Sequence, residues 1–342
     1  MIGTRLAHAG WSEQIFGDKQ MIRRRHFILT ATSSTLPLWA AADAYPTQPV
    51  HAVVSNAPGT GTDITARFVA NQMSKRWGVP VVVENKAGAG GALGTDFVAK
   101  TAPDGYNILF STGAHYSLPA LYDNLNFDAR ADLVPVASFA QAPIVVFVPA
   151  NSPFKTVQDL VAAAKKAPGG ITYASPGAGT SSHLAAVMLA QQAGIDMLHV
   201  PYKAASQAGL EGASGQAKVG FNGTGATLPL LQAGKIPMLA VTSLKRSAAL
   251  PQVPTLDESG LKGYDFVTPI LALVRAGTPA PVVEAIGAAM TAAAAQPEFK
   301  ELCKAQGLDV AIQGPAELKV AAPREFDKAR RLVQLAGVEV QR

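Results

Sequence analysis

Hydrophobic and polar positions follow two alternating patterns along most of the chain. Short apolar runs rich in valine, as at 50–54, alternate with longer segments whose apolar residues recur every three or four positions. The first pattern is typical of buried strands and the second of amphipathic helices. In the helix predicted over 63–77, Ala66, Val69 and Met73 share one face. This alternation predicts an α/β architecture with largely parallel sheets.

The predicted elements form two sets. The first set comprises segments at 50–56, 63–77, 81–85, 91–101 and 106–112. The second comprises segments at 156–167, 171–175, 180–193, 198–202, 205–213, 218–222, 226–233 and 237–243. Apolar runs at 143–149 and 266–274 bracket the second set, which predicts that the chain crosses twice between two lobes. Helices predicted at 281–306 and 315–336 then complete the first lobe.

The two predicted lobes have defined limits. Residues 45–144 and 270–342 are expected to form lobe 1, and residues 145–269 to form lobe 2. Ligands of open α/β sheets bind beyond the carboxyl ends of the strands. Loops from both lobes should therefore face a ligand cleft between them.

Residues 1–44 are predicted to be an export signal. Arg24 and Arg25 begin a stretch that resembles a twin-arginine motif, an apolar segment follows, and the small residues at 42–44 offer a cleavage site. Met21 is an alternative start. A membrane anchor fits less well, because the apolar segment is shorter than the roughly 18 residues that a membrane span needs. We therefore expect a soluble periplasmic protein after cleavage.

The net charge and the cysteine content argue against nucleic-acid binding and against sites built from cysteines. The formal net charge is +5, but residues 1–44 hold five basic and three acidic residues, so the remainder carries only +3. Without a basic run after Arg25, this surplus does not indicate nucleic-acid binding. The single cysteine, Cys303, excludes an internal disulfide and a cysteine-based zinc cluster. We expect neither a metal nor a cofactor.

The segment 55–63, S-N-A-P-G-T-G-T-D, joins the first predicted strand to the first predicted helix. Its proline and glycines break regular structure, and Thr62 or Asp63 could cap the helix. Helix N-termini carry unpaired N–H donors and partial positive charge, so they bind carboxylates and phosphates. Taken alone, a Gly-rich turn is more often an ordinary strand-to-helix connection.

A second loop at 175–183, S-P-G-A-G-T-S-S-H, is built from nearly the same residues and again leads from a strand to a helix. One such loop in each lobe favours a small anion held between two helix N-termini by N–H groups and hydroxyls. The residues predicted to bind it are Asn56, Ala57, Gly59, Thr60, Gly61, Thr62, Asp63, Ser175, Gly179, Thr180, Ser181 and His183. For His183, packing or capping fits at least as well as ligand binding.

Other strand ends add four candidates. The loop at 111–116 could bring Thr112 or His115 to the cleft, although it also fits a plain surface turn. Tyr202 and Asn222 each end a predicted strand, and Tyr202 could stack on a ligand or pack in the core. The glycine-rich stretch 86–94 departs from the spacing of a dinucleotide fingerprint, so a structural turn beside the cleft fits it better.

Two alternatives to a transport receptor stay open. No G-x-S-x-G or H-E-x-x-H motif occurs, but a periplasmic hydrolase could use Ser181 with His183. Their positions, two apart at a helix start, point in different directions and suit proton transfer poorly. A solute receptor that feeds a sensor kinase is the other alternative. We favour a non-enzymatic receptor.

An ordered series of short motifs spans the chain from residue 45 to residue 337. The motifs are A-P-G-T-G-T-D (57–63), V-V-V-E-N-K-A-G-A-G-G (81–91), P-D-G-Y (103–106), Y-A-S-P-G-A-G-T-S-S-H-L (173–184), H-V-P-Y-K (199–203), A-G-K-I (233–236) and L-P-Q-V-P-T (250–255). On these motifs the chain resembles the Bug-type receptors, the solute-binding proteins of tripartite tricarboxylate transporters. The resemblance implies a two-lobed type II periplasmic-binding-protein fold that closes on a small organic carboxylate.

The resemblance also implies partners and points to specificity. The partners would be one large and one small membrane subunit of a transporter, and we expect a monomer. In this family the two loops grip the carboxylate through backbone amides, hydroxyls and waters. Asn56 stands where the family often has phenylalanine, and Thr60 interrupts its usual run of glycines. Because Asn56 exchanges an apolar wall for an amide, a more polar ligand is expected.

Overall fold

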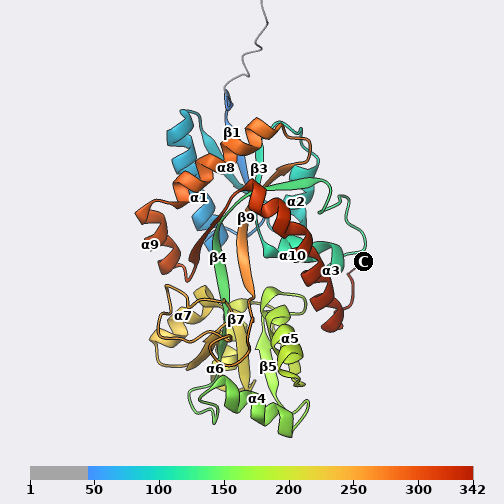
Figure 1. The fold of residues 1–342 in the computed structure, drawn as a ribbon, viewed down its shortest axis with the longest axis vertical. Helices are drawn as coiled ribbons and strands as arrows, with labels where there is room; N and C mark the ends of the chain where they lie inside the picture. Colours follow the sequence, from blue (N-terminus) through green and yellow to red (C-terminus); the bar gives the residue numbers. More distant parts are fainter. Residues whose placement is uncertain (1–44, 342) are drawn as a thin grey trace, which may run out of the picture. The chain divides into compact units, whose positions relative to one another are not determined.

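The computed structural model describes residues 45–341, so the predicted export signal lies outside the described part. Within that part ten strands form a mixed sheet in the order β2-β1-β3-β9-β4-β7-β5-β6, and β8 and β10 each pair with β4 (Figure 1). No helix between residues 45 and 341 has the length and hydrophobicity that crossing a membrane requires.

The first lobe is built on parallel strands. Its elements are β1 (Val50–Val54), α1 (Gly61–Trp77), β2 (Val81–Asn85), the short 3-10 helix η1 (Ala89–Gly91), α2 (Ala92–Ala99), β3 (Asn107–Thr112), the 3-10 helix η2 (Gly113–Ser117) and α3 (Leu118–Leu121). β1 pairs in parallel with β2 and β3, so three strands end at one edge of the sheet. Val69 and Met73 of α1 are fully buried in the same core as Phe110. The predicted apolar face of this helix is confirmed.

The second lobe repeats this plan. Its elements are α4 (Val157–Lys166), β5 (Thr172–Ser175), α5 (Ser181–Ala193), β6 (Leu198–Pro201), α6 (Ala205–Ser214), β7 (Val219–Gly223), α7 (Thr224–Gln232) and β8 (Met238–Val241). β5 pairs in parallel with β6 and β7. A separate core, which contains Leu160, Leu184 and Phe221, holds these elements together.

Two long antiparallel strands, β4 (Leu133–Phe147) and β9 (Val267–Arg275), join the lobes (Figure 1). β4 pairs with β9 and β10 along its first part and with β7 and β8 along its last part. The apolar runs expected to be crossovers are therefore hydrogen-bonded strands of the sheet. The prediction of largely parallel sheets is wrong, because every pairing of β4 and β9 is antiparallel. An apolar run indicates burial but not strand direction.

The C-terminal segment returns to the first lobe through α8 (Ala280–Ala294), α9 (Pro297–Ala305), β10 (Asp309–Gln313) and α10 (Pro315–Leu335). The single helix predicted at 281–306 is wrong, because Pro297, which has no N–H, begins a second helix. In α10, Phe326 is buried in a first-lobe core, whereas Leu332 and Val333 are buried in the second-lobe core. α10 therefore contributes to both lobes. The residue limits of the two lobes stay a prediction.

Candidate functional site

The loop between β1 and α1 caps its helix with Thr60. The Thr60 hydroxyl accepts the Asp63 N–H at 3.4 Å and donates to the Ala57 carbonyl at 2.8 Å. The Asp63 carboxylate in turn accepts the Gly59 N–H at 2.9 Å. The predicted cap, Thr62 or Asp63, is therefore wrong: the extended backbone of Thr60 lets its hydroxyl reach the third residue of the helix.

The loop between β5 and α5 repeats this geometry bond for bond. The Thr180 hydroxyl accepts the His183 N–H at 3.4 Å and donates to the Gly177 carbonyl at 2.8 Å. His183 Nδ1 accepts the Gly179 N–H at 3.0 Å, which confirms its predicted alternative role in capping. Gly179 has a φ of 75° and its counterpart Gly59 a φ of 79°, a conformation that favours glycine. Two helices thus present N-termini of the same construction.

Arg67 neutralises the one carboxylate in the first loop. Its Nε and Nη2 atoms lie 3.1 and 3.0 Å from the Asp63 oxygens, and Asn85 donates to the same carboxylate at 2.9 Å. Burial raises the pKa of Asp63, but the bonds from Arg67, Gly59 and Asn85 outweigh this and leave the pKa below its ordinary value. Asp63 is thus ionised yet paired, so it repels an anion at the helix N-terminus only weakly.

A cluster of three rings supports the second loop. The ring centroid of His199 lies 4.9 Å from that of Tyr173 and 3.9 Å from that of His183, and the centroids of Tyr173 and His183 are 6.1 Å apart. His199 Nε2 is 2.7 Å from the Ser175 hydroxyl at the end of β5. Burial lowers the pKa of His183 and that of His199 to about 4, and His199 adds to the shift of His183. Both rings are therefore uncharged at neutral pH.

A cavity of about 410 Å³, which we call the cleft, opens between the two loops. It lies at the ends of β1, β2, β3 and β5. The second loop is close to the first lobe here, because a Cβ added at Gly179 would lie 2.7 Å from the Leu121 side chain. Within residues 45–341, no charged side chain lines it. An anion in the cleft would therefore be bound by backbone N–H groups, hydroxyls and amides.

The cleft brings together part of the predicted site. The predicted residues that line it are Asn56, Ala57, Thr112, Gly179, Thr180 and Ser181. Those that do not line it are Gly59, Thr60, Gly61, Thr62, Asp63, His115, Ser175, His183, Tyr202 and Asn222. The ligand contacts of all these residues stay a prediction.

Two residues outside the cleft have evident structural roles. His115 is 1% exposed and packs edge-on against Tyr116 and Phe326, and burial lowers its pKa to about 4. Asn222 is fully buried, and its side chain donates to the Ala205 carbonyl at 2.7 Å and accepts the Gly223 N–H at 2.9 Å. Neither side chain reaches the cleft in this arrangement.

The turn after β2 also lines the cleft, as the interpretation of 86–94 as a turn beside it anticipated. Gly88, Gly90 and Gly91 lie on the cleft wall, and all have positive φ. Ala89 has a φ of 47°, a conformation that costs an alanine roughly 1 kcal/mol. Such strain is typical of binding sites. Gln341, near the C-terminus, also lines the cleft, and no sequence pattern points to it.

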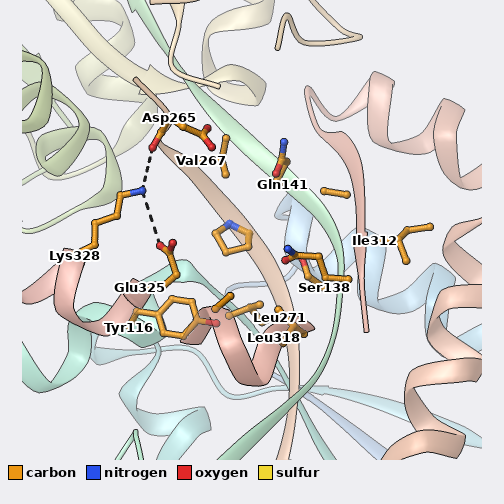
Figure 2. A pocket seen from close by; sticks show the side chains of 14 residues that line it. Tyr116, Ser138, Gln141, Asp265, Val267, Leu271, Ile312, Leu318, Glu325 and Lys328 are labelled. Carbon is orange, nitrogen blue, oxygen red and sulfur yellow. Dashed lines mark hydrogen bonds and ion pairs between the residues drawn. The ribbon is translucent and has the colours of Figure 1, made fainter. Parts of the chain in front are cut away.

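A second cavity, of about 260 Å³, lies beside the strands that join the lobes (Figure 2). We call it the hinge cavity. Its walls come mainly from β4, β9, β10 and α10, and it shares no lining residue with the cleft. None of the predicted site residues lies in it.

Comparison with known proteins identifies the family. The pattern of a family described as "Tripartite tricarboxylate transporter family receptor" matches residues 65–338. The chain belongs to this receptor family. A relative from Pseudomonas sp. (strain P51), the "UPF0065 protein in tcbD-tcbE intergenic region", is 36% identical over 292 residues, which are 85% of this chain and 87% of that protein.

Solved structures of receptors agree with this fold. Periplasmic binding protein BugD is 35% identical with a TM-score of 0.70, and the match covers 87% of this chain and all of that one. Rpa4515 of R. palustris, solved with adipate, is 27% identical with a TM-score of 0.73, and the match again covers 87% of this chain and all of that one. The predicted Bug-type resemblance and two-lobed periplasmic-binding fold are confirmed. By family, the protein is a solute receptor.

Proposed function

We propose that the protein captures a small organic carboxylate in the cleft and delivers it to the permease of a tripartite tricarboxylate transporter. One observation carries this proposal: the loops with matching caps from both lobes meet at one cavity that, within residues 45–341, no charged side chain lines, and the cap and first residue of α5 line it. Helix N-termini favour anions without a cationic side chain. The adipate bound to the related Rpa4515 is a dicarboxylate, which supports the same ligand class.

The alternative hydrolase has no support at the cleft. The candidate base, His183, uses Nδ1 to accept the Gly179 N–H and stacks on His199. The other serine–histidine contact, Ser175 with His199, involves a serine that is fully buried. A nucleophile must reach its substrate, so neither pair suits acyl transfer. We propose a receptor without catalytic activity.

The place and partners of the receptor follow from the same proposal. The protein would be exported, cleaved after residue 44 and soluble in the periplasm as a monomer. One large and one small membrane subunit would receive the ligand from it. The sensor-kinase alternative uses the same cleft and differs only in the protein that recognises the loaded form.

A ligand screen tests the proposal. The purified protein is heated with dicarboxylates such as adipate and malate, with tricarboxylates, and with aromatic acids. A ligand that binds only the folded state raises the melting temperature, so at least one acid should do so. Uncharged amides of the same acids serve as controls and should give no shift. A screen in which no acid stabilises the protein, or in which the amides do so equally, would contradict the proposal.

A further inference from the structure

The hinge cavity is lined by polar groups, two of them hydroxyls that make no hydrogen bond within the described residues. Its volume of about 260 Å³ equals roughly nine water molecules at ~30 Å³ each. Tyr116 is 5% exposed and Ser138 is 1% exposed, and both line the cavity. Neither hydroxyl makes a hydrogen bond within residues 45–341, and neither oxygen is completely buried. Both hydroxyls are therefore available to an occupant of the cavity.

One wall of the cavity carries opposite charges. Lys328 Nζ donates to the Asp265 carbonyl at 3.0 Å and lies 4.0 Å from a Glu325 carboxylate oxygen (Figure 2). A lysine has three N–H donors, so Lys328 retains donors for a further acceptor. At 4.0 Å, Lys328 is too distant to hydrogen-bond Glu325, whose carboxylate accepts no hydrogen bond within the described residues.

The facing wall carries neutral polar groups. Ser138 and Gln141 come from β4, and Gln313 comes from β10 beside it. Pro269 and Leu271 of β9 form an apolar surface between the two walls. A ligand here would thus meet one ammonium, the acidic residues Glu325 and Asp265, hydroxyls and amides.

We propose that the hinge cavity is a second binding site, for a small zwitterion such as an α-amino acid. The ammonium of the zwitterion would lie at Glu325 and its carboxylate at Lys328, while the hydroxyls of Tyr116 and Ser138 complete its hydrogen bonds. A simple anion would be repelled by Glu325 and Asp265, and a simple cation by Lys328. The volume admits a small amino acid such as glycine or L-serine.

This site is separate from the cleft. A small cavity of about 30 Å³ lies between them and shares Ser117 and Ser181 with the cleft. It shares Tyr116, Glu325 and Lys328 with the hinge cavity. The two larger cavities therefore lie on either side of one packed layer, and each can be altered without changing the lining of the other.

Calorimetric titration of the purified protein with glycine and L-serine tests the site, with acetate and methylammonium as single-charge probes. We expect both zwitterions to bind and both single-charge probes to bind at least about tenfold more weakly. Glu325→Gln and Lys328→Gln should each weaken zwitterion binding about tenfold. Lys319→Gln, which alters an exposed lysine of α10, and Thr180→Ala in the cleft should leave it unchanged.

A structure determined with L-serine decides where the zwitterion lies. Serine between Lys328 and Glu325 supports the proposal. Water alone in the hinge cavity, or binding lost with Thr180→Ala but kept with Glu325→Gln, overturns it. These results leave the proposed function of the cleft untouched, because that function is measured with carboxylates and with cleft variants.

Discussion

The imidazole rings of His183 and His199 stack face to face, with 3.9 Å between centroids and 9° between planes. His183 accepts the Gly179 N–H in the loop that caps α5, and His199 contacts Ser175 at the end of β5. The shape of the second binding loop therefore depends on an uncharged His183, because a protonated Nδ1 cannot accept that bond.

Stability should fall as the pH drops below 6.5. Burial lowers the pKa of His183 and His199 to about 4 from an ordinary value of 6.5, so the unfolded chain binds more protons between these values. The stabilisation is complete above pH 6.5 and is lost as the pH falls toward 4, by about 1.4 kcal/mol per pH unit for each group. Urea unfolding at several pH values in this range measures the slope.

Two histidine variants separate the buried pair from other titrating groups. His199→Gln removes one buried imidazole and should reduce the slope. His51→Gln removes an exposed histidine and should leave it unchanged. Equal slopes in the wild type and in His199→Gln would show that other groups cause the pH dependence.

The cap residue Thr180 should matter for binding as well as for stability. Thr180→Ala removes the hydroxyl that accepts the His183 N–H, and should cost about 1 kcal/mol of stability and about tenfold in carboxylate affinity. Thr156→Ala is the matched control, because Thr156 caps α4 in the same way but lies outside the cleft. Thr156→Ala should lower the stability by a similar amount without changing the carboxylate affinity. An equal loss of affinity in both variants would contradict a role of Thr180 in binding.

Loss of Arg67 should weaken carboxylate binding through Asp63. In Arg67→Met the Asp63 carboxylate loses both its ion pair and its hydrogen bond from Nε, so its charge acts on the bound anion. We expect a several-fold loss of affinity, part of which salt restores because the Debye length is about 10 Å at 0.1 M. Arg76→Met, at the exposed end of α1, is the control. Unaltered affinity in Arg67→Met would contradict this electrostatic argument.

Gly179 should tolerate no side chain. Its φ of 75° is unfavourable for alanine, and the added Cβ would meet Leu121 at 2.7 Å. Gly194 has a similar φ of 61°, but a Cβ added there would contact no other atom. Gly194→Ala therefore measures the cost of the backbone conformation alone, roughly 1 kcal/mol. Gly179→Ala should cost more than this, and adding Leu121→Ala should recover the excess. Unfolding free energies of the three variants check this, and equal costs for the two glycine changes would exclude the contact.

Much of the fold could be predicted because it rests on hydrophobic periodicity. The apolar face of α1 and the strand-to-helix order of both lobes follow directly from spacing. The direction of β4 and β9 could not be predicted, since buried strands look alike whichever way they run. β10 was also missed, because Asp309–Gln313 alternates too weakly to be distinguished from a loop.

The site was predictable where it depends on the strand ends. The two capped loops share a motif, so their similarity was visible in the sequence. The residue that caps α1 could not be predicted, because Thr60, Thr62 and Asp63 all have a side-chain oxygen that could accept the hydrogen bond. The pairing of Arg67 with Asp63 had a signal in their spacing of four residues on a helix. No sequence pattern indicated the hinge cavity, because its walls come from segments far apart in the chain.

Because α10 is buried in both cores, neither lobe can lose its structure alone without exposing part of this helix. Unfolding of the first lobe would expose Phe326, and unfolding of the second lobe would expose Leu332. Exposed apolar surface of this kind costs about 25 cal/mol per Å². The helix therefore couples the lobes energetically, and heat should unfold them in one cooperative calorimetric transition despite their separate cores.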